Sequence, residues 1–580
     1  MNEQLLEPLR FYKSRGKDLF KQNATDYFDR LHKESGVNAD ENRATVKEYN
    51  KEMAAAETVK KKIQGKRTAK GLLIALIVIA SIVALFGVFS AVGGDIATGL
   101  LMIAGGAAAI VLSALLIAKK LNPAIKKADE ILQKHLDKAG ELLNLAREQM
   151  APLNALFTNE DSLRLIEQTV PELKFDERYT VENHRLFVEK HDFIELSDNE
   201  CSTLDTLSGN FAGNPFLFTR RLIHEMRSET YHGTLTISWT ETYRDSKGNL
   251  RTRRRTQTLH ASVVKPKPYF YKSNHLIYGN QAAPDLSFSR DPQHSERFEK
   301  KELERRVKKG AKELKKLSEK ATEEGRSFQE MANTEFEVLF GATNRDHEVQ
   351  FRLMYTPLAQ INTVDLLTSK DGYGDDFKFT KKRRFNIITS EHAQRWTPDC
   401  SASNYYSHDI DEAKRKFISF NESYFKSVFF DFAPLLSVPA YVEEPCSSLE
   451  EYDGYQSYYT QYEHEVMANA IGYNRFVHPL SETEAILKTD IIKKQADGDK
   501  VAVTAFSYST EPRIDYVPVM GGDGHIHNVP VPWTEYIPRQ NISDIFISSA
   551  PLKKNNADRS STPSADETLA YLHGLAAKLL

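Results

Sequence analysis

A short segment near the C-terminus places two histidines beside an aspartate, in the order Asp523-Gly-His525-Ile-His527. Residues two apart on a strand point to the same side, so both imidazoles could bind one cation together with the Asp523 carboxylate. This arrangement predicts a metal site, in its sharpest form that of a metal-dependent hydrolase. Glycine-rich segments of this kind are also common in surface loops, and the sequence assigns no further ligand. An exposed turn is therefore the alternative interpretation.

Other catalytic patterns are absent from the sequence. It contains no GxxxxGK[ST] phosphate loop, no HExxH motif, no GxSxG turn and no glycine-rich dinucleotide turn. The segment Gly372-Tyr-Gly-Asp-Asp376 carries two carboxylates but lacks a lysine or hydroxyl suited to phosphate, and we interpret it as a turn. His392 follows Glu391 without a partner that the sequence identifies. We therefore expect no catalytic residues, no cofactor and no enzymatic activity.

Composition narrows the class of protein further. The chain has 77 Lys and Arg against 80 Asp and Glu, so its net charge of -3 gives no reason to expect a nucleic-acid partner. Its 31 Phe and 25 Tyr supply enough apolar surface for folded cores. Cys201, Cys400 and Cys446 lie far apart, which fits neither a disulfide framework nor a zinc site and suits a reducing compartment.

A predicted β-hairpin carries a cluster of basic residues near its turn. Leu235, Ile237 and Trp239 alternate with threonines and serine, and the return strand places Leu259, Ala261 and Val263 on one face. The basic residues follow the turn at 245–249: Arg251, Arg253, Arg254 and Arg255. Such a tip could contact anionic lipid headgroups or phosphates. A solvated turn without a partner is the alternative, and nucleic acid is the less favoured ligand.

The remaining elements are organised around two apolar runs, Gly71–Ser90 and Ile96–Ala118, which contain no charged residue. Each is long enough to cross a hydrocarbon core of about 30 Å as a helix. Only five residues separate them, which predicts a transmembrane hairpin over residues 71–118. The second run is rich in glycine and alanine, which favours either packing inside the hairpin or self-association between chains.

The flanks of these runs predict their orientation. Lys60, Lys61, Lys62, Lys66, Arg67 and Lys70 precede the first run, and Lys119, Lys120, Lys126 and Lys127 follow the second. The connecting loop has no basic residue, only Asp95. The positive-inside rule therefore predicts an inner-membrane protein with two spans and both termini in the cytoplasm.

The overall expectation is an α+β protein with a transmembrane hairpin, a helical cytoplasmic stalk and two or three mixed α/β soluble units. Helical periodicity continues after the second run to about residue 156. Strands are expected at 349–355, 377–379, 385–388 and in the region 500–536, an aromatic helix at 409–430 ending before Pro434, and a terminal helix at 565–580 opened by a Ser564–Glu567 capping box. The predicted divisions are a helical segment 1–70, the hairpin 71–118, a stalk helix 119–158, a first α+β domain 159–292, a charged helix 293–330, a second α+β domain 331–445, a β-rich region 446–550, and a linker with the terminal helix, 551–580.

One segment resembles a family of uncharacterised bacterial membrane proteins. It contains Phe336-Glu-Val-Leu-Phe340, then His347-Glu-Val-Gln-Phe-Arg352, and then Thr356-Pro357. Proteins of that family combine a paired membrane span near the N-terminus with a cytoplasmic α+β domain and a similar FExxF…TP segment. The resemblance covers about thirty residues and the order of the parts. It implies a bacterial membrane protein and brings no activity or catalytic residues.

These observations together predict a membrane-anchored cytoplasmic scaffold or interaction protein, with a homo-oligomer or a protein partner. Two other classes stay open at this point. One is a membrane-tethered enzyme, for example a metal hydrolase using His525 and His527. The other is a small oligomeric channel lined by the second span.

Overall fold

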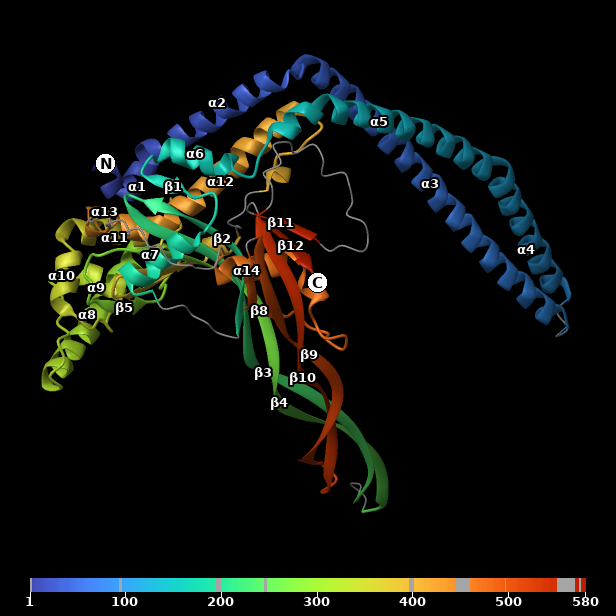
Figure 1. The fold of residues 1–580 in the computed structure, drawn as a ribbon. Coiled ribbons are helices and arrows are strands. Elements are labelled where there is room, and N and C mark those ends of the chain that lie inside the picture. Colours follow the sequence, from blue (N-terminus) through green and yellow to red (C-terminus); the bar gives the residue numbers. More distant parts are fainter. Residues whose placement is uncertain are drawn as a thin grey trace. The chain divides into compact units, whose positions relative to one another are not determined.

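The computed structural model describes residues 3–92, 96–193, 200–244, 248–395, 401–443, 459–495, 497–549, 569–572 and 575–580. The fold is mixed α+β, with long helices and two antiparallel sheets (Figure 1). Two compact units make up the chain. One comprises Met1–Asn23, Asn159–Ser401 and Asn421–Leu580 and holds both sheets; the other, Ala24–Thr158 with Ala402–Phe420, is helical.

Two long antiparallel helices dominate the helical unit. The first is α3 (Ala39–Val92), and the second runs through α4 (Ile96–Leu116) and a π-helical turn (Ile117–Leu121) into α5 (Asn122–Leu156). Both are long and apolar enough to cross a membrane, as the sequence predicted. Their uncharged stretches expose large side chains: Leu72, Phe89 and Leu101 are 69%, 70% and 77% exposed. Residues 93–95, which include Asp95, lie outside the described residues.

Small residues let the two helices approach closely. Gly99 and Gly106 of α4 lie one heptad apart, and a Cβ atom added at either would come within 2.8 Å of backbone oxygens of α3, those of Gly87 and Ala80 respectively. Gly105 has no such neighbour within 4 Å. The packing inside the hairpin, one of the two alternatives for this glycine-rich run, therefore uses Gly99 and Gly106.

We predict that Gly106→Ile separates the two helices whereas Gly105→Ile does not. The added side chain at 106 meets the backbone of α3, and overpacking of this kind destabilises by about 1–3 kcal/mol. The efficiency with which a lipid-soluble maleimide labels a cysteine introduced at Ala84, whose side chain faces Gly106, is expected to rise in the first variant and stay unchanged in the second. Equal efficiency in both variants would contradict this packing.

The part of the helical pair predicted as a stalk is joined by ion pairs. Glu52 of α3 accepts hydrogen bonds from Lys138 (2.8 Å) and pairs with His135 (2.6 Å) of α5. These contacts, with Lys138 the larger, lower the pKa of Glu52 to about 2. Arg67 and Asp129 approach within 3.4 Å nearer the uncharged stretches.

The larger sheet joins two regions that the sequence analysis had assigned to separate domains. Its strand order is β1-β2-β3-β4-β7-β6-β5, and β4 pairs with β7 through residues 276–279 and 385–388. The sheet therefore takes strands from both 159–292 and 331–445. Its strands are β1 (Leu173–Phe175), β2 (Cys201–Phe211), β3 (Asn214–Arg244), β4 (Leu250–Gly279), β5 (Ser287–Arg290), β6 (Phe377–Lys382) and β7 (Phe385–Ser390).

The second sheet has the strand order β11-β12-β10-β9-β8 and a core of its own. Val501, Val503, Ile545 and Ile547 are fully buried there, together with Met467 of the helix α14 (Gln461–Ile471). Of the tyrosine-rich run 452–462, residues 452–458 lie outside the described residues, and Tyr459 and Tyr462 are buried. The strands are β8 (Ile486–Gln495), β9 (Gly498–Met520), β10 (Ile526–Ser549), β11 (Leu569–Leu572) and β12 (Leu575–Leu579).

The remaining helices are shorter. Helix α8 confirms the predicted charged helix, and α12 confirms the predicted aromatic helix, although Pro434 lies inside it and not after its end. The helices are α1 (Pro8–Phe11), α2 (Lys17–Ser35), α6 (Asp161–Thr169), α7 (Val181–His191), α8 (Lys300–Glu323), α9 (Thr334–Phe340), α10 (Glu348–Met354), α11 (Pro357–Thr368), α12 (Ile410–Leu436), α13 (Ala440–Glu443) and α14 (Gln461–Ile471).

Two predicted elements are wrong. The segment 349–355 is helix α10 and not a strand: Phe351 and Met354 are buried, but Val349 and Leu353, which the strand pattern placed on the same side as Phe351, are 63% and 71% exposed. The described part of the predicted terminal helix forms strands β11 and β12, because Leu575 and Ala577 pack into the second sheet as β12 pairs with β10. The linker at 551–564 and the capping box lie outside the described residues.

The two long hairpins extend beyond their sheets and pack against each other. Strands β3 and β4 stay paired to Arg244 and Leu250, and β9 and β10 to Met520 and Ile526 (Figure 1). We call residues 224–244, 250–275, 507–520 and 526–544 the arm. A Cβ at Gly233 of β3 would lie 2.1 Å from the Pro530 carbonyl oxygen of β10, so glycine allows the two hairpins their close approach. The predicted hairpin with Leu235, Ile237 and Trp239 on its inner face is confirmed.

Candidate functional site

The predicted metal residues lie in the turn between β9 and β10, where they form an ion pair. His527 Nε2 is 2.9 Å from Asp523 Oδ2, and the backbone N–H of His525 donates to Asp523 Oδ1 (3.1 Å). Burial alone would raise the pKa of Asp523, but these contacts lower it overall. The His525 side chain is exposed. Among the described residues, no group of three or more His, Cys, Asp or Glu side chains is arranged to hold a metal ion. The metal assignment stays a prediction.

The predicted basic tip is partly neutralised within its own hairpin. Glu241 of β3 accepts hydrogen bonds from Arg253 and Arg255 of β4, which lower its pKa. Arg254 donates to the Ser238 hydroxyl on the other face (3.1 Å). The tip therefore presents several guanidinium groups with one balancing carboxylate among the described residues.

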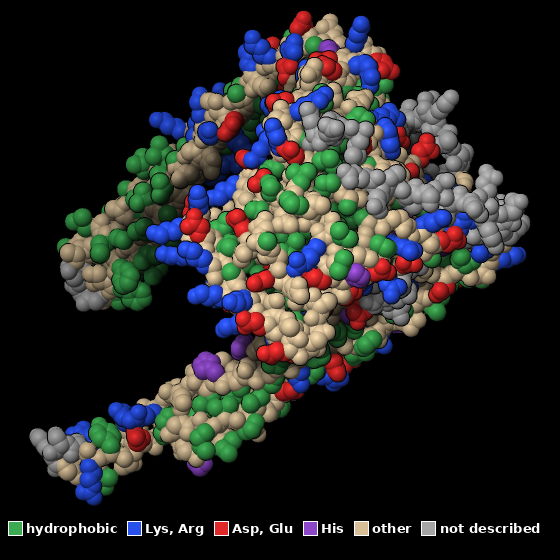
Figure 2. Space-filling view, turned by 90° about the vertical axis from the view of Figure 1, so that its left-hand side faces the viewer, with side chains coloured by type: hydrophobic (Ala, Val, Ile, Leu, Met, Phe, Trp, Pro, Cys, Tyr) green, Lys and Arg blue, Asp and Glu red, His purple; other side chains and the backbone are tan. Residues whose placement is uncertain are grey.

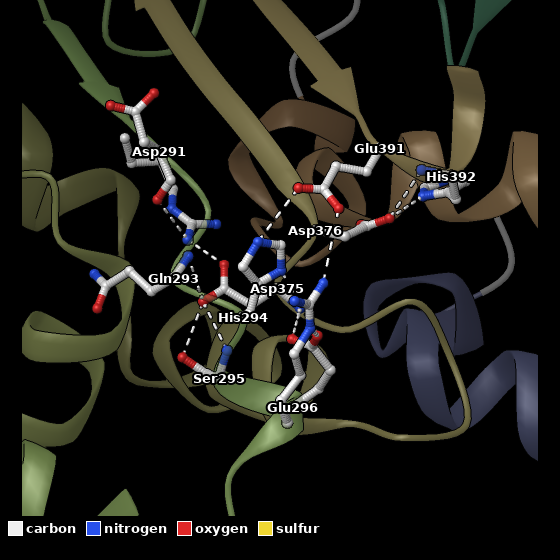
Figure 3. A network of polar contacts seen from close by, with 11 residues as sticks. Asp291, Gln293, His294, Ser295, Glu296, Asp375, Asp376, Glu391 and His392 are labelled. Carbon is white, nitrogen blue, oxygen red and sulfur yellow. Dashed lines mark hydrogen bonds and ion pairs between the residues drawn. The ribbon is translucent and has the colours of Figure 1, made fainter. Parts of the chain in front are cut away.

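A buried polar network surrounds the turn 372–376 that precedes β6. Figure 3 shows Asp375 and Asp376 pointing in different directions, Asp375 towards Ser295 and Asp376 towards His392. Asp375 forms an ion pair with Arg290 of β5, and both side chains are fully buried. Its other oxygen accepts hydrogen bonds from the Ser295 hydroxyl (2.9 Å) and from the backbone N–H of Gln293 (3.2 Å). The turn thereby holds β5 and the segment after it against β6.

The second carboxylate of the turn belongs to a chain of three titratable groups. His392 Nδ1 lies 2.7 Å from Asp376 Oδ2, and its Nε2 lies 3.1 Å from the Ser427 carbonyl and 3.5 Å from Asp431 of α12. Tyr373 stacks on the imidazole, with ring centroids 3.9 Å apart. Burial alone would lower the pKa of His392, but the two carboxylates outweigh burial and raise it. Burial raises the pKa of Asp431 to about 6.

The contacts of this network connect neighbouring elements, and the described residues place no nucleophile beside His392. A triad needs a hydroxyl or thiol opposite the histidine's carboxylate partner. In the described residues, His392 Nε2 instead faces a backbone carbonyl and a second carboxylate. Towards the surface, His294 lies 3.3 Å from Glu391, and the Glu296 carboxylate accepts a hydrogen bond from the Asp375 backbone N–H (3.0 Å) (Figure 3).

The raised pKa values of Asp431 and His392 predict that the stabilisation from these two groups is lost as the pH rises. Asp431 binds its proton more tightly in the folded chain than in the unfolded one, so its contribution is present below about pH 4 and is lost by about pH 6. His392 contributes in the same direction, and its share is lost above about pH 6.5. Between pH 4 and pH 8, the free energy of unfolding of Asp431→Asn should therefore fall less than that of the wild type. The difference between the two falls should be roughly 2–3 kcal/mol.

Denaturant unfolding in detergent at several pH values measures this difference. Asp291→Asn is the matched control, since Asp291 forms an exposed pair with Lys378. Parallel pH profiles for the wild type and Asp431→Asn would contradict the raised pKa of Asp431.

The segment that carries the family resemblance forms an aromatic cluster that packs against Phe288 of β5. Phe336 and Phe340 of α9 pack on Phe351 and Tyr355 with ring centroids 4.9–6.4 Å apart. The buried Arg345 binds Glu337 (2.5 Å) and Glu348 (2.7 Å), and Thr356 caps α11 ahead of Pro357. The residues that carry the resemblance therefore serve packing, ion pairing and helix capping in this structure.

A small cavity lies beside Asp176, lined by the segment 176–179, by β2 and α14, and by Leu572 and Leu575 of β11 and β12. Asp176 accepts hydrogen bonds from Asn183 (2.6 Å) and from the Ser208 hydroxyl (2.8 Å), while burial raises its pKa. Arg178 lies 3.4 Å from Glu463, which completes the capping box of α14 with Thr460. These polar groups join α7 and α14 to the sheet.

Sequence reasoning missed Arg290 and Asp431 and found no partner for His392. The sequence features that could have indicated the His392–Asp376 contact are the adjacent carboxylates 375–376 and the histidine sixteen residues after Asp376. Asp431 lies in an aromatic helix whose pattern indicated only packing. Comparison of the chain with protein-family models, with curated proteins and with solved structures gave no match.

Proposed function

We propose that this protein is a membrane-anchored scaffold or interaction protein. The observation that supports it is the pair of uncharged helical stretches in α3 and α4, whose large apolar side chains are exposed over their length. Exposed apolar surface of this extent is favourable in lipid and strongly unfavourable in water. Figure 2 shows these hydrophobic side chains covering the end of the helical pair.

The orientation belongs to the same proposal. Six basic residues precede the first uncharged stretch and four follow the second. Both soluble flanks then lie in the cytoplasm under the positive-inside rule. The tight seam at Gly99 and Gly106 favours an anchor over a channel, because these small residues are engaged inside the hairpin.

An interaction role is favoured over catalysis. The buried polar groups around Asp375, His392 and Arg345 are held by partners from neighbouring elements. The turn 521–527 that would serve a metal hydrolase forms a two-residue ion pair. By contrast, the arm presents long exposed faces of two hairpins, a form suited to contact with a large surface.

Purification in mild detergent tests this role, with light scattering for the mass of the assembly and mass spectrometry for what co-purifies. A fixed homo-oligomer or a stoichiometric partner is expected. A monomer without a companion would contradict the scaffold role. Stoichiometric zinc or manganese that is lost in His525→Ala/His527→Ala would favour the enzyme instead.

A further inference from the structure

One hairpin of the arm is longer than the other and leaves part of its inner face uncovered. The turn between β9 and β10 ends against the β3–β4 hairpin, where the Gly522 N–H donates to Gln257 Oε1 (2.7 Å) and Trp239 lies alongside. Strand β3 continues five residues further, to Arg244. At about 3.4 Å per residue, the β3–β4 hairpin overhangs by roughly 17 Å.

The uncovered face of this overhang is basic and aromatic. Side chains alternate along a strand, so Glu241 and Tyr243 point to the same side as Leu235, Ile237 and Trp239. The residues opposite Trp239, Glu241 and Tyr243 on β4 are Arg255, Arg253 and Arg251. This side therefore carries three arginines and one glutamate, and the Arg253 guanidinium also stacks over Tyr243 (5.6 Å).

The outer face of the shorter hairpin is uncharged and mostly apolar. Its cross-strand pairs are Met520 with Ile526, Pro518 with Asn528, Tyr516 with Pro530 and Ile514 with Pro532. Met520, Ile526, Tyr516 and Ile514 are 62%, 66%, 65% and 55% exposed. Charged neighbours such as Arg513 and Asp515 alternate onto the other side, where they pair with Glu535 and Lys265.

The two surfaces face the same side of the arm. The β9–β10 hairpin packs on part of the inner face of the β3–β4 hairpin. The outer face of the β9–β10 hairpin is therefore turned to the same side as the uncovered inner face beyond it. Figure 2 shows hydrophobic side chains gathered on the arm, with Lys and Arg side chains towards its end. The opposite side of the arm is a ladder of hydroxyls, exposed at Thr234, Thr236, Ser238, Thr240 and Thr242.

We propose that this side of the arm lies on an anionic phospholipid surface, with the apolar residues in the acyl boundary and the arginines at the headgroups. A surface with a continuous apolar face beside arginines matches the layered chemistry of a membrane interface. Nucleic acid would use the arginines but not the apolar face. The inference rests on the proposed membrane anchoring, because tethering keeps the arm near a bilayer.

The experiment uses the full chain with its three cysteines changed to serine, reconstituted in bilayers that contain doxyl lipids. A fluorophore is attached to a single cysteine at Ile526→Cys, Thr240→Cys or Leu101→Cys. We expect lipid quenching at 526 in phosphatidylcholine with phosphatidylglycerol, at least about twofold stronger than at 240 on the hydroxyl side. Quenching at 526 should fall in phosphatidylcholine alone and in Arg251→Gln/Arg253→Gln/Arg255→Gln.

The three labels separate the possible failures. No quenching at 526 with strong quenching at 101 would overturn the lipid contact and leave the anchor intact. Protection of 526 from aqueous iodide without lipid quenching would also overturn it, and would indicate a second copy or a protein on this face. Absence of quenching at 101 would instead contradict the proposed anchoring.

Discussion

Replacing Arg290 by methionine is expected to lower the free energy of unfolding by about 3–5 kcal/mol, among the largest losses for a single substitution in this chain. The reason is that the fully buried Asp375 carboxylate would be left without its ionic partner. The hydrogen bonds from Ser295 and from the Gln293 backbone would remain, but they do not replace a guanidinium. Denaturant unfolding of the detergent-solubilised chain measures the loss.

Two further variants identify the cause of that loss. Lys378→Met breaks the exposed pair with Asp291 and should change stability by less than about 1 kcal/mol. Arg290→Met combined with Asp375→Asn should recover part of the loss, since no buried charge is left unpaired. A double variant as unstable as the sum of the two single variants would contradict an ionic origin.

Gly233→Leu is expected to separate the two hairpins of the arm, with a loss of roughly 3 kcal/mol or more. The new Cβ would lie 2.1 Å from the Pro530 carbonyl oxygen and 2.8 Å from the Val531 Cα, so backbone and not a flexible side chain obstructs it. Hydrogen exchange at 526–538 of β10 should accelerate, while amides of the second sheet at 501–505 stay protected.

The neighbouring position supplies the control for this prediction. Thr234 is exposed on the hydroxyl side of the same strand, so Thr234→Leu should leave exchange in β10 unchanged. Equal exchange in the two variants would show that the hairpins do not depend on close contact at Gly233.

Elements with a long, regular pattern could be predicted from the sequence. The two uncharged runs, the helix to residue 156 and the hairpin with Leu235, Ile237 and Trp239 each repeat one period over many residues. Short elements were less secure. The alternation at 349–355 also fits a helix that buries Phe351 and Met354, and pairing with β10 outweighs the helical preference of the C-terminal residues.

Contacts between distant segments could not be predicted, and they determine the candidate site. The pairing of β4 with β7 joins residues more than a hundred positions apart, and Asp431 reaches His392 from a helix whose sequence indicates only apolar packing. The sequence pattern identified the turn 372–376. Residue spacing does not predict that Asp375 pairs with Arg290 while Asp376 pairs with His392. The amphipathic side of the arm likewise depends on two hairpins packing together.

Cysteine labelling in intact cells tests the central claim, membrane anchoring with both soluble flanks on one side, most directly. The native cysteines are replaced by serine, and single cysteines are introduced at Gly94 or Thr242. We expect an impermeant maleimide to label the 94 variant in intact bacterial cells whose outer membrane admits the reagent, and to label the 242 variant only after the inner membrane is opened. A 94 variant that stays unlabelled until the inner membrane is opened, or a 242 variant labelled in intact cells, would contradict the account.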